Sequence, residues 1–165
     1  MQRSCDEQGF VQSQRHLPHW ELEGAAYFLT WRCLPGVKLE PADRDIVARN
    51  LRHWDGRRYL LFGATVMPDH VHLCLKPFEE GGRAVSLARI LHSAKSYTAL
   101  AINRRRGRTG SIWQEERFDR ILRSRAELRD ALAYIHQNAV AEGLVSAPLE
   151  YQWLLCQEPE RVPPH

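Results

Sequence analysis

The feature that most restricts the fold is a pair of apolar segments in the middle of the chain, separated by only two residues. Residues 59–67 (YLLFGATVM) and 70–76 (HVHLCLK) are rich in aliphatic and aromatic side chains, and Pro68-Asp69 lies between them. This composition favours strands, and so short a connection requires an antiparallel pair, because a parallel crossover needs a dozen or more residues. A hairpin is therefore predicted at the centre of a sheet.

Strand and helix patterns alternate on both sides of this hairpin. Residues 25–33 (AAYFLTWRC) favour a strand, and residues 43–54 carry apolar side chains at helical spacing. Residues 86–105 have the most regular three- and four-residue apolar steps in the chain, and Ser86 is their N-cap candidate. Tyr97 follows the same steps and is predicted to pack inward.

The end of the chain completes the order of elements. Residues 117–123 alternate weakly as a short strand, and Ser124 with Glu127 forms a capping-box signature that predicts a helix running towards Asn138 and Gly143. The resulting order, strand, helix, strand, strand, helix, strand, helix, matches the split βαβ or ferredoxin-like plan. We therefore predict an α+β fold in which helices pack on one face of an antiparallel sheet.

Composition is typical of one globular domain. The chain has 165 residues, 44% hydrophobic and 26% charged, which disfavours both disorder and membrane spanning. We expect a polar N-terminal arm at 1–24, a folded domain at 25–145 and a Pro-rich acidic tail at 146–165. The cysteines show no CxxC spacing, so neither a disulfide framework nor a zinc ribbon is supported, and a reducing cytoplasm is the expected location. The four cysteines are Cys5, Cys33, Cys74 and Cys156.

Arginine dominates the cations. The chain has 20 arginines and three lysines, yet its net charge is only +3. Residues 101–125 hold eight arginines against three acids, a local charge of +5, and guanidinium groups bind phosphates in bidentate geometry. This segment is predicted to form a phosphate-binding surface. The candidate nucleic-acid-binding residues are Arg104, Arg105, Arg106, Arg108, Trp113, Arg117, Arg120 and Arg123.

Two of these assignments have structural alternatives. Arg104, Arg105 and Arg106 suit a solvated helix end that interacts with its own dipole, as well as a phosphate site. Trp113 suits a buried anchor of its loop as well as a platform on which bases stack.

Two pairs of residues carry candidate chemistry. His70 and His72 alternate with Val71 along a strand, so both imidazoles project from one face and can converge on a metal ion. Tyr134 and Asn138 are four residues apart on the last predicted helix, which supplies a nucleophilic phenol and an amide oxygen on one face. The alternatives are two polar histidines on a solvated face, and a packed tyrosine beside a residue near a helix end.

Several motifs occur in a characteristic order. They are RHLPH at 15–19, YFLTWR at 27–32, VMPDHVHL at 66–73, Trp113-Gln114 with Arg117-Phe118, and Tyr134-Ile135 with Asn138 and Gly143-Leu144-Val145. Over residues 14–155 this set resembles the HUH (histidine-hydrophobic-histidine) single-tyrosine transposases, and most closely the REP-associated tyrosine transposases. One departure is Ala139, where the family often has proline.

The resemblance implies residue roles. His70, His72 and Asn138 would bind a divalent metal ion, Mg²⁺ or Mn²⁺, and Tyr134 would be the nucleophile that forms a 5′-phosphotyrosine. Residues 25–145 would then be the catalytic domain. Ligand chemistry adds that two imidazoles favour Mn²⁺ or Zn²⁺ over Mg²⁺. Tyr97 is a poorer nucleophile candidate, because the residue four positions on, Ala101, cannot bind a metal.

The resemblance also implies a partner and a reaction. Single-stranded or hairpin DNA with REP-like palindromes would be cleaved and rejoined by a bacterial cytoplasmic protein, associated with the nucleoid when bound to DNA. No membrane partner is expected. We expect a monomer, with a homodimer as the alternative. The main alternative is a non-cleaving single-stranded nucleic-acid-binding protein of the same fold, and a third class is a metal-dependent nuclease that uses water.

Overall fold

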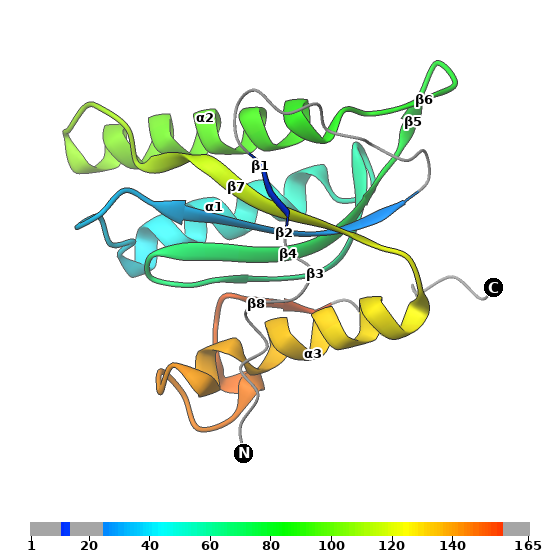
Figure 1. Ribbon diagram of the computed structural model, residues 1–165. Helices are drawn as coiled ribbons and strands as arrows, with labels where there is room; N and C mark the ends of the chain where they lie inside the picture. The colour runs from blue at the N-terminus through cyan, green and yellow to red at the C-terminus, as the bar shows by residue number, and fades with distance from the viewer. Residues whose placement is uncertain (1–10, 14–24, 157–165) are drawn as a thin grey trace.

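A six-stranded antiparallel sheet forms the centre of the protein (Figure 1). The computed structural model describes residues 11–13 and 25–156, and the motif at 15–19 lies outside them. From one edge to the other, the strands are β1 (Val11–Ser13), β7 (Trp113–Leu122), β2 (Ala26–Cys33), β4 (His70–Pro77), β3 (Tyr59–Val66) and β8 (Leu154–Cys156).

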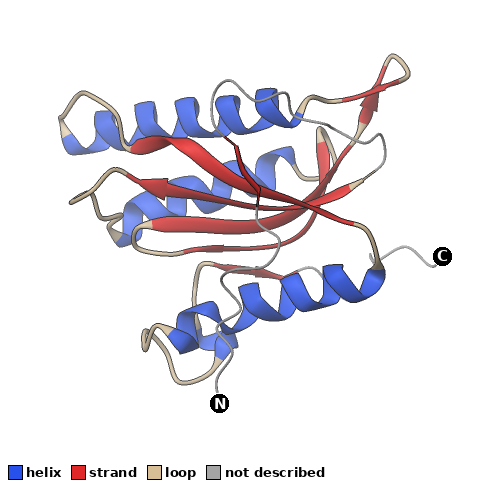
Figure 2. Cartoon of the chain, in the orientation of Figure 1, coloured by secondary structure: helices blue, strands red, loops and turns tan. Residues whose placement is uncertain are grey.

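Helices lie on both sides of this sheet (Figure 2). The crossover helices α1 (Pro41–Trp54) and α2 (Leu87–Arg106) cover one face, and α3 (Arg125–Ala141) covers part of the other. The small hairpin of β5 (Glu79–Glu80) and β6 (Arg83–Ala84) precedes α2. A single 3-10 turn, η1 (Pro148–Glu150), links α3 to β8.

The predicted fold class is confirmed, with one correction. Strands β7, β2, β4 and β3 lie in the order expected of a split βαβ plan, and every strand pair is antiparallel. The prediction that helices pack on one face holds for α1 and α2 but is wrong for α3. The reason is that the second face also carries apolar side chains, among them Phe28, Phe62 and Cys74, which α3 buries with Leu128 and Ile135.

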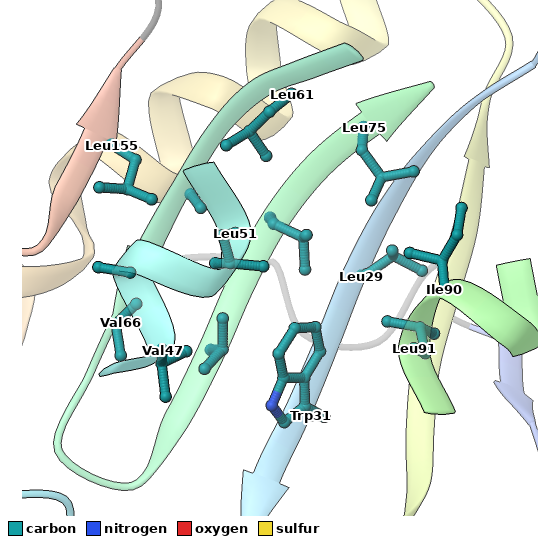
Figure 3. Packing of buried hydrophobic residues seen from close by; sticks show 14 of the residues in the cluster. Leu29, Trp31, Val47, Leu51, Leu61, Val66, Leu75, Ile90, Leu91 and Leu155 are labelled. Atoms are coloured by element: carbon teal, nitrogen blue, oxygen red, sulfur yellow. The ribbon is translucent and has the colours of Figure 1, made fainter. Parts of the chain in front are cut away.

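The main core lies between the sheet and the two crossover helices (Figure 3). Leu29 and Trp31 of β2 and Leu75 of β4 point into it from the sheet, and Leu51 of α1 and Ile90 of α2 cover them. The alternation of side chains along a strand assigns these residues to one face and their sequence neighbours to the other.

Both predicted N-caps are present. The Ser86 hydroxyl accepts a hydrogen bond from Arg89 N, and the Ser124 hydroxyl accepts one from Glu127 N. The reciprocal bond of the capping box is displaced by one residue, because the Glu127 carboxylate accepts from Arg123 N instead of from Ser124 N. The Glu127 bond ties the end of β7 to the start of α3.

The folded part extends beyond the boundary expected at residue 145. Leu154–Cys156 forms β8, which pairs with β3, and the side chains of Tyr151 and Leu155 are buried. The tail expected at 146–165 is therefore corrected for residues 148–156, where apolar side chains at two-residue spacing are enough to extend a sheet. Within the expected N-terminal arm, Val11–Ser13 pairs with β7.

No helix among residues 11–13 and 25–156 has the length and apolar character needed to cross a membrane.

Gly63 of β3 lets α3 lie close to the sheet. A Cβ atom at this position would be 2.9 Å from Leu132 Cδ2 of α3 and 3.4 Å from the Leu155 carbonyl oxygen. The missing side chain therefore sets how near α3 can lie to the sheet.

Replacing Gly63 by alanine is expected to lower the free energy of unfolding by about 1 to 3 kcal/mol, because the added methyl overpacks this contact. Urea unfolding followed by circular dichroism measures the change. The same substitution in a Leu132→Ala background should cost less, since the obstructing methyl is absent. An equal loss in both backgrounds would contradict this origin of the strain.

Candidate functional site

His70 and His72 lie on β4 and project from the face of the sheet that α3 covers, which we call the histidine face. Both are buried, with exposed fractions of 3% and 4%, and their ring centroids are 4.6 Å apart. In the register of β2 with β4, Thr30 pairs with His72 and Arg32 with His70. The strand alternation predicted from the sequence therefore brings both imidazoles to one place.

A carboxylate orients His70. His70 Nδ1 donates to Asp69 Oδ1 at 2.6 Å, and the other oxygen of Asp69 accepts from Lys38 Nζ at 2.6 Å. Burial would raise the pKa of Asp69, but the hydrogen bonds from Lys38 and His70 outweigh it and lower this pKa to about 2. With its proton on Nδ1, His70 presents the lone pair of Nε2 for coordination.

A hydroxyl orients His72. Its Nδ1 shares a hydrogen bond of 2.6 Å with Thr30 Oγ1, and Phe28 stacks on the imidazole at 5.6 Å between centroids. Burial, reinforced by repulsion from the protonated form of His70 and from Arg32, lowers the pKa of His72 to about 3. The ring is therefore neutral at physiological pH, the form in which imidazole binds metals.

Helix α3 places Tyr134 beside this pair. The Tyr134 ring meets His72 edge to face at 5.1 Å and Phe28 at 5.9 Å between centroids. Its side chain is 43% exposed, in contrast to the buried histidines. One side of the phenol thus packs on the imidazole while the rest can be reached from solvent.

Asn138 follows one turn after Tyr134 and is buried. Its Oδ1 and the Nε2 of His72 are both buried, and neither atom has a hydrogen-bond partner in the described part of the chain. Buried polar atoms without partners are costly, and a bound cation would satisfy both. Two imidazole nitrogens and one amide oxygen are a suitable donor set for Mn²⁺ or Zn²⁺, so the residues present fit the metal that the resemblance implies.

No group of three or more histidine, cysteine or carboxylate side chains suited to a metal occurs among residues 11–13 and 25–156. The set of His70, His72 and Asn138 is not a group of this kind, because its third donor is an amide oxygen.

Two of the expected DNA-binding arginines have a structural task instead. Arg105 Nε donates to Asp43 Oδ1 at 2.9 Å, and Arg106 pairs with Asp43 Oδ2 and donates to the Lys38 carbonyl at 2.6 Å. Asp43 is fully buried in the first turn of α1, where a carboxylate needs cationic partners. The prediction that Arg105 and Arg106 bind DNA is therefore corrected: they attach the end of α2 to α1.

Trp113 and Arg117 also differ from the predicted DNA surface. Trp113 is buried, its Nε1 donates to Thr98 Oγ1 at 3.0 Å, and it meets Trp31 edge to face. The alternative of a buried anchor is therefore correct, and the stacking platform is wrong. Arg117 pairs in register with Trp31, so it belongs to the face under α1 and α2, and its Nε donates to Asp119 Oδ2 at 3.2 Å.

The remaining four arginines lie in three places. Arg104 and Arg108 are exposed at the C-terminal end of α2, on the side of the sheet opposite the histidine face. Arg123 is exposed in the connection from β7 to α3. Arg120 pairs in register with Phe28 and so belongs to the histidine face.

Arg32 is a residue that the sequence reasoning missed. It is exposed, and its register with His70 assigns it to the histidine face beside the site. The signal was present in the sequence, because Arg32 is two residues from Thr30 on a predicted strand and therefore shares its face. Phe118 of β7 pairs with Thr30 and adds an aromatic side chain to the same face.

Tyr97 is exposed, in contrast to its predicted inward packing. Its side chain is 59% exposed on α2, and Thr98 takes the inward position, where its hydroxyl accepts the bond from Trp113. Because α2 lies on the other side of the sheet from the histidines, Tyr97 cannot serve as a nucleophile at this site.

Comparison with known proteins agrees with the fold. The chain is similar to the solved structure of a REP-associated tyrosine transposase bound to a REP hairpin, with a TM-score of 0.70 over 86% of this chain and 82% of that chain. The two chains are 16% identical over this match, so the likeness is one of fold. No protein-family model matches the sequence, and no curated protein matches it.

Removing the Asp43 charge with Asp43→Asn is expected to lower the free energy of unfolding by about 3 kcal/mol, because Arg105 and Arg106 lose their buried partner. Burial raises the pKa of Asp43, but the bonds from Arg106, Glu40 N and Arg105 lower it below the unfolded value.

The folded state then binds fewer protons than the unfolded state, so stability contributed by Asp43 is present above pH about 4 and is lost as the pH falls further. Thermal unfolding between pH 3 and 7 measures this, and the Asn variant should lose less stability on acidification. Equal acid sensitivity in both proteins would contradict the role of Asp43.

Proposed function

We propose that the protein cleaves and rejoins single-stranded DNA, with Tyr134 as the nucleophile. The observation that carries the proposal is the position of an accessible phenol against His72. Beside it lie two buried atoms able to bind a metal, His72 Nε2 and Asn138 Oδ1, which have no hydrogen-bond partner in the described chain. The fold of a REP-associated tyrosine transposase supports the same reaction class.

The reaction exchanges one phosphodiester for another. Tyr134 Oη attacks the scissile phosphorus in line, the bond from phosphorus to the 3′ oxygen breaks, and a 5′-phosphotyrosine forms. The proton lost by the phenol balances the proton gained by the released 3′-hydroxyl. A free 3′-hydroxyl can later attack the phosphotyrosine and restore both the DNA strand and the phenol, without ATP.

The chain's own residues hold this arrangement in place. Phe28 of β2 and His72 of β4 contact the Tyr134 ring, so the phenol is positioned by the sheet as well as by its helix. His70, His72 and Asn138 would hold a divalent ion, Mg²⁺ or Mn²⁺. When bound, such an ion stabilises negative charge on the phosphate and on the leaving oxygen.

The part of the histidine face formed by β2 and β7 is the proposed path of the DNA strand. Arg32 supplies positive charge, and Phe118 supplies an aromatic ring, a combination suited to unpaired nucleic acid. Arg120 adds a second guanidinium to this face and also forms a partly exposed ion pair with Glu127 at 3.7 Å. Arg123 lies where β7 leads into α3 and extends this surface. We assign the strand to these residues, beside Tyr134, and not to the end of α2.

The nucleophile is tested with a fluorescent hairpin oligonucleotide, Mn²⁺ and a denaturing gel. The wild-type chain should form a covalent protein–DNA adduct, and Tyr134→Phe should form none, because it lacks the attacking oxygen. Tyr97→Phe is the matched control and should keep the wild-type adduct yield, since Tyr97 is exposed on α2.

The other outcomes separate the rival classes. An adduct with Tyr134→Phe would refute the nucleophile. Cleavage without any adduct would identify a hydrolase that uses water, and DNA binding without cleavage would identify a binding protein.

The proposed DNA path is tested by salt dependence. Arg32→Ala and Arg120→Ala should each weaken binding to a labelled single-stranded oligonucleotide and reduce the slope of log affinity against log salt by about 0.7. Arg89→Ala, an exposed arginine on α2, is the control and should leave the slope unchanged. Fluorescence anisotropy at several salt concentrations measures both quantities. Unchanged slopes for Arg32→Ala and Arg120→Ala would place the DNA elsewhere.

A further inference from the structure

Helix α3 brings one more oxygen to the histidine pair. Glu142, the C-cap residue of α3, places Oε1 3.7 Å from His70 Nε2. Because His70 Nδ1 donates to Asp69, Nε2 is the nitrogen that faces the proposed metal site. The Glu142 carboxylate therefore approaches the coordinating side of the imidazole.

The spacing on α3 explains this approach. Glu142 N donates to the Asn138 carbonyl at 3.0 Å, so helical geometry continues one full turn past Asn138. Tyr134, Asn138 and Glu142 thus follow one another at four-residue steps along one stripe. Tyr134 lies against His72 at one end of the stripe and Glu142 against His70 at the other, with the buried Asn138 between them.

The electrostatics of the helix end favour a cation near Glu142, and Lys38 is close enough for its charge to interact with the Glu142 carboxylate. The negative end of the helix dipole disfavours a carboxylate at a C-terminus, and the last turn of α3 contains no basic residue. The Glu142 side chain is still 43% exposed, so it can turn towards an ion or towards water.

We propose that Glu142 is a fourth ligand of the metal ion, together with His70, His72 and Asn138. The inference rests on the metal site of the proposed function. Two donors about 2.1 Å from one ion are about 3 Å apart at a right angle and about 4.2 Å apart when opposite. The 3.7 Å between His70 Nε2 and Glu142 Oε1 lies within this range. As their side chains lie in the described chain, His70, His72 and Glu142 do not yet form a metal-binding group, so Glu142 would complete the site by turning its exposed carboxylate towards the ion.

The fourth ligand changes which ion the site prefers. Two imidazoles and an amide form a neutral set that favours softer divalent ions, whereas a carboxylate adds charge and a hard oxygen donor. Glu142 therefore moves the preference towards Mn²⁺ and Mg²⁺ and away from Zn²⁺.

The test measures Mn²⁺ binding to the full chain without DNA, by the electron paramagnetic resonance signal of free Mn²⁺. Glu142→Gln should weaken Mn²⁺ binding about tenfold or more. Glu142→Asp, which keeps the charge but is one methylene shorter, should bind more weakly than wild type if the carboxylate touches the ion. Glu80→Gln on the β5–β6 hairpin is the matched control and should bind as wild type.

Folding is checked separately by thermal unfolding in EDTA, where all variants should match wild type because Glu142 and Glu80 are exposed. If Glu142→Gln does not fold, the Asp variant decides the question. Mn²⁺ affinities of folded Glu142 variants within about twofold of wild type would overturn the assignment, as would a wild-type chain that binds no Mn²⁺.

The binding assay is independent of cleavage. If Mn²⁺ binding depends on Glu142 but no Tyr134 adduct forms, the ligand assignment stands and the proposed reaction fails. If the adduct forms and Mn²⁺ binding does not depend on Glu142, the reaction stands and the ligand assignment fails.

Discussion

Burial of β4 on both faces is the constraint on which the rest of the structure depends. The strand lies in the middle of the sheet, so its side chains enter two different environments at alternate positions. Val71 and Leu73 enter the core under α1 and α2, while His70 and His72 are buried on the other face. Buried imidazoles need polar partners, and Thr30 and Asp69 supply these partners and fix the orientation of each ring.

Helix α3 turns this buried strand into a candidate site. It packs on the second face because that face is apolar over β2, β3 and β4, and Gly63 allows the close approach. Packing of its own Ile135 in the cluster with Phe28 and Phe62 holds the helix in place, and the four-residue steps then aim Tyr134, Asn138 and Glu142 at the histidines. The same contacts that stabilise the fold therefore set the geometry of the proposed chemistry.

The arginines show how a charge total can mislead. The segment 101–125 carries +5 in sequence, but its charges divide between two faces of the sheet and a buried ion pair. Arg105 and Arg106 stabilise the α1–α2 contact through Asp43, and Arg117 pairs with Asp119. Charge becomes a binding surface only where strands and helices leave it on the same face as the site.

Local patterns in the sequence determined the elements and the pairs within them. Strand alternation placed His70 with His72, and helical spacing placed Tyr134 with Asn138, because both periods depend on backbone geometry alone. The tertiary structure decided which face each pair occupies, the placement of α3 opposite α1 and α2, the burial of Trp113 and the approach of Glu142 to His70. These are contacts between residues distant in sequence, and they depend on which apolar faces pack together, which no local period specifies.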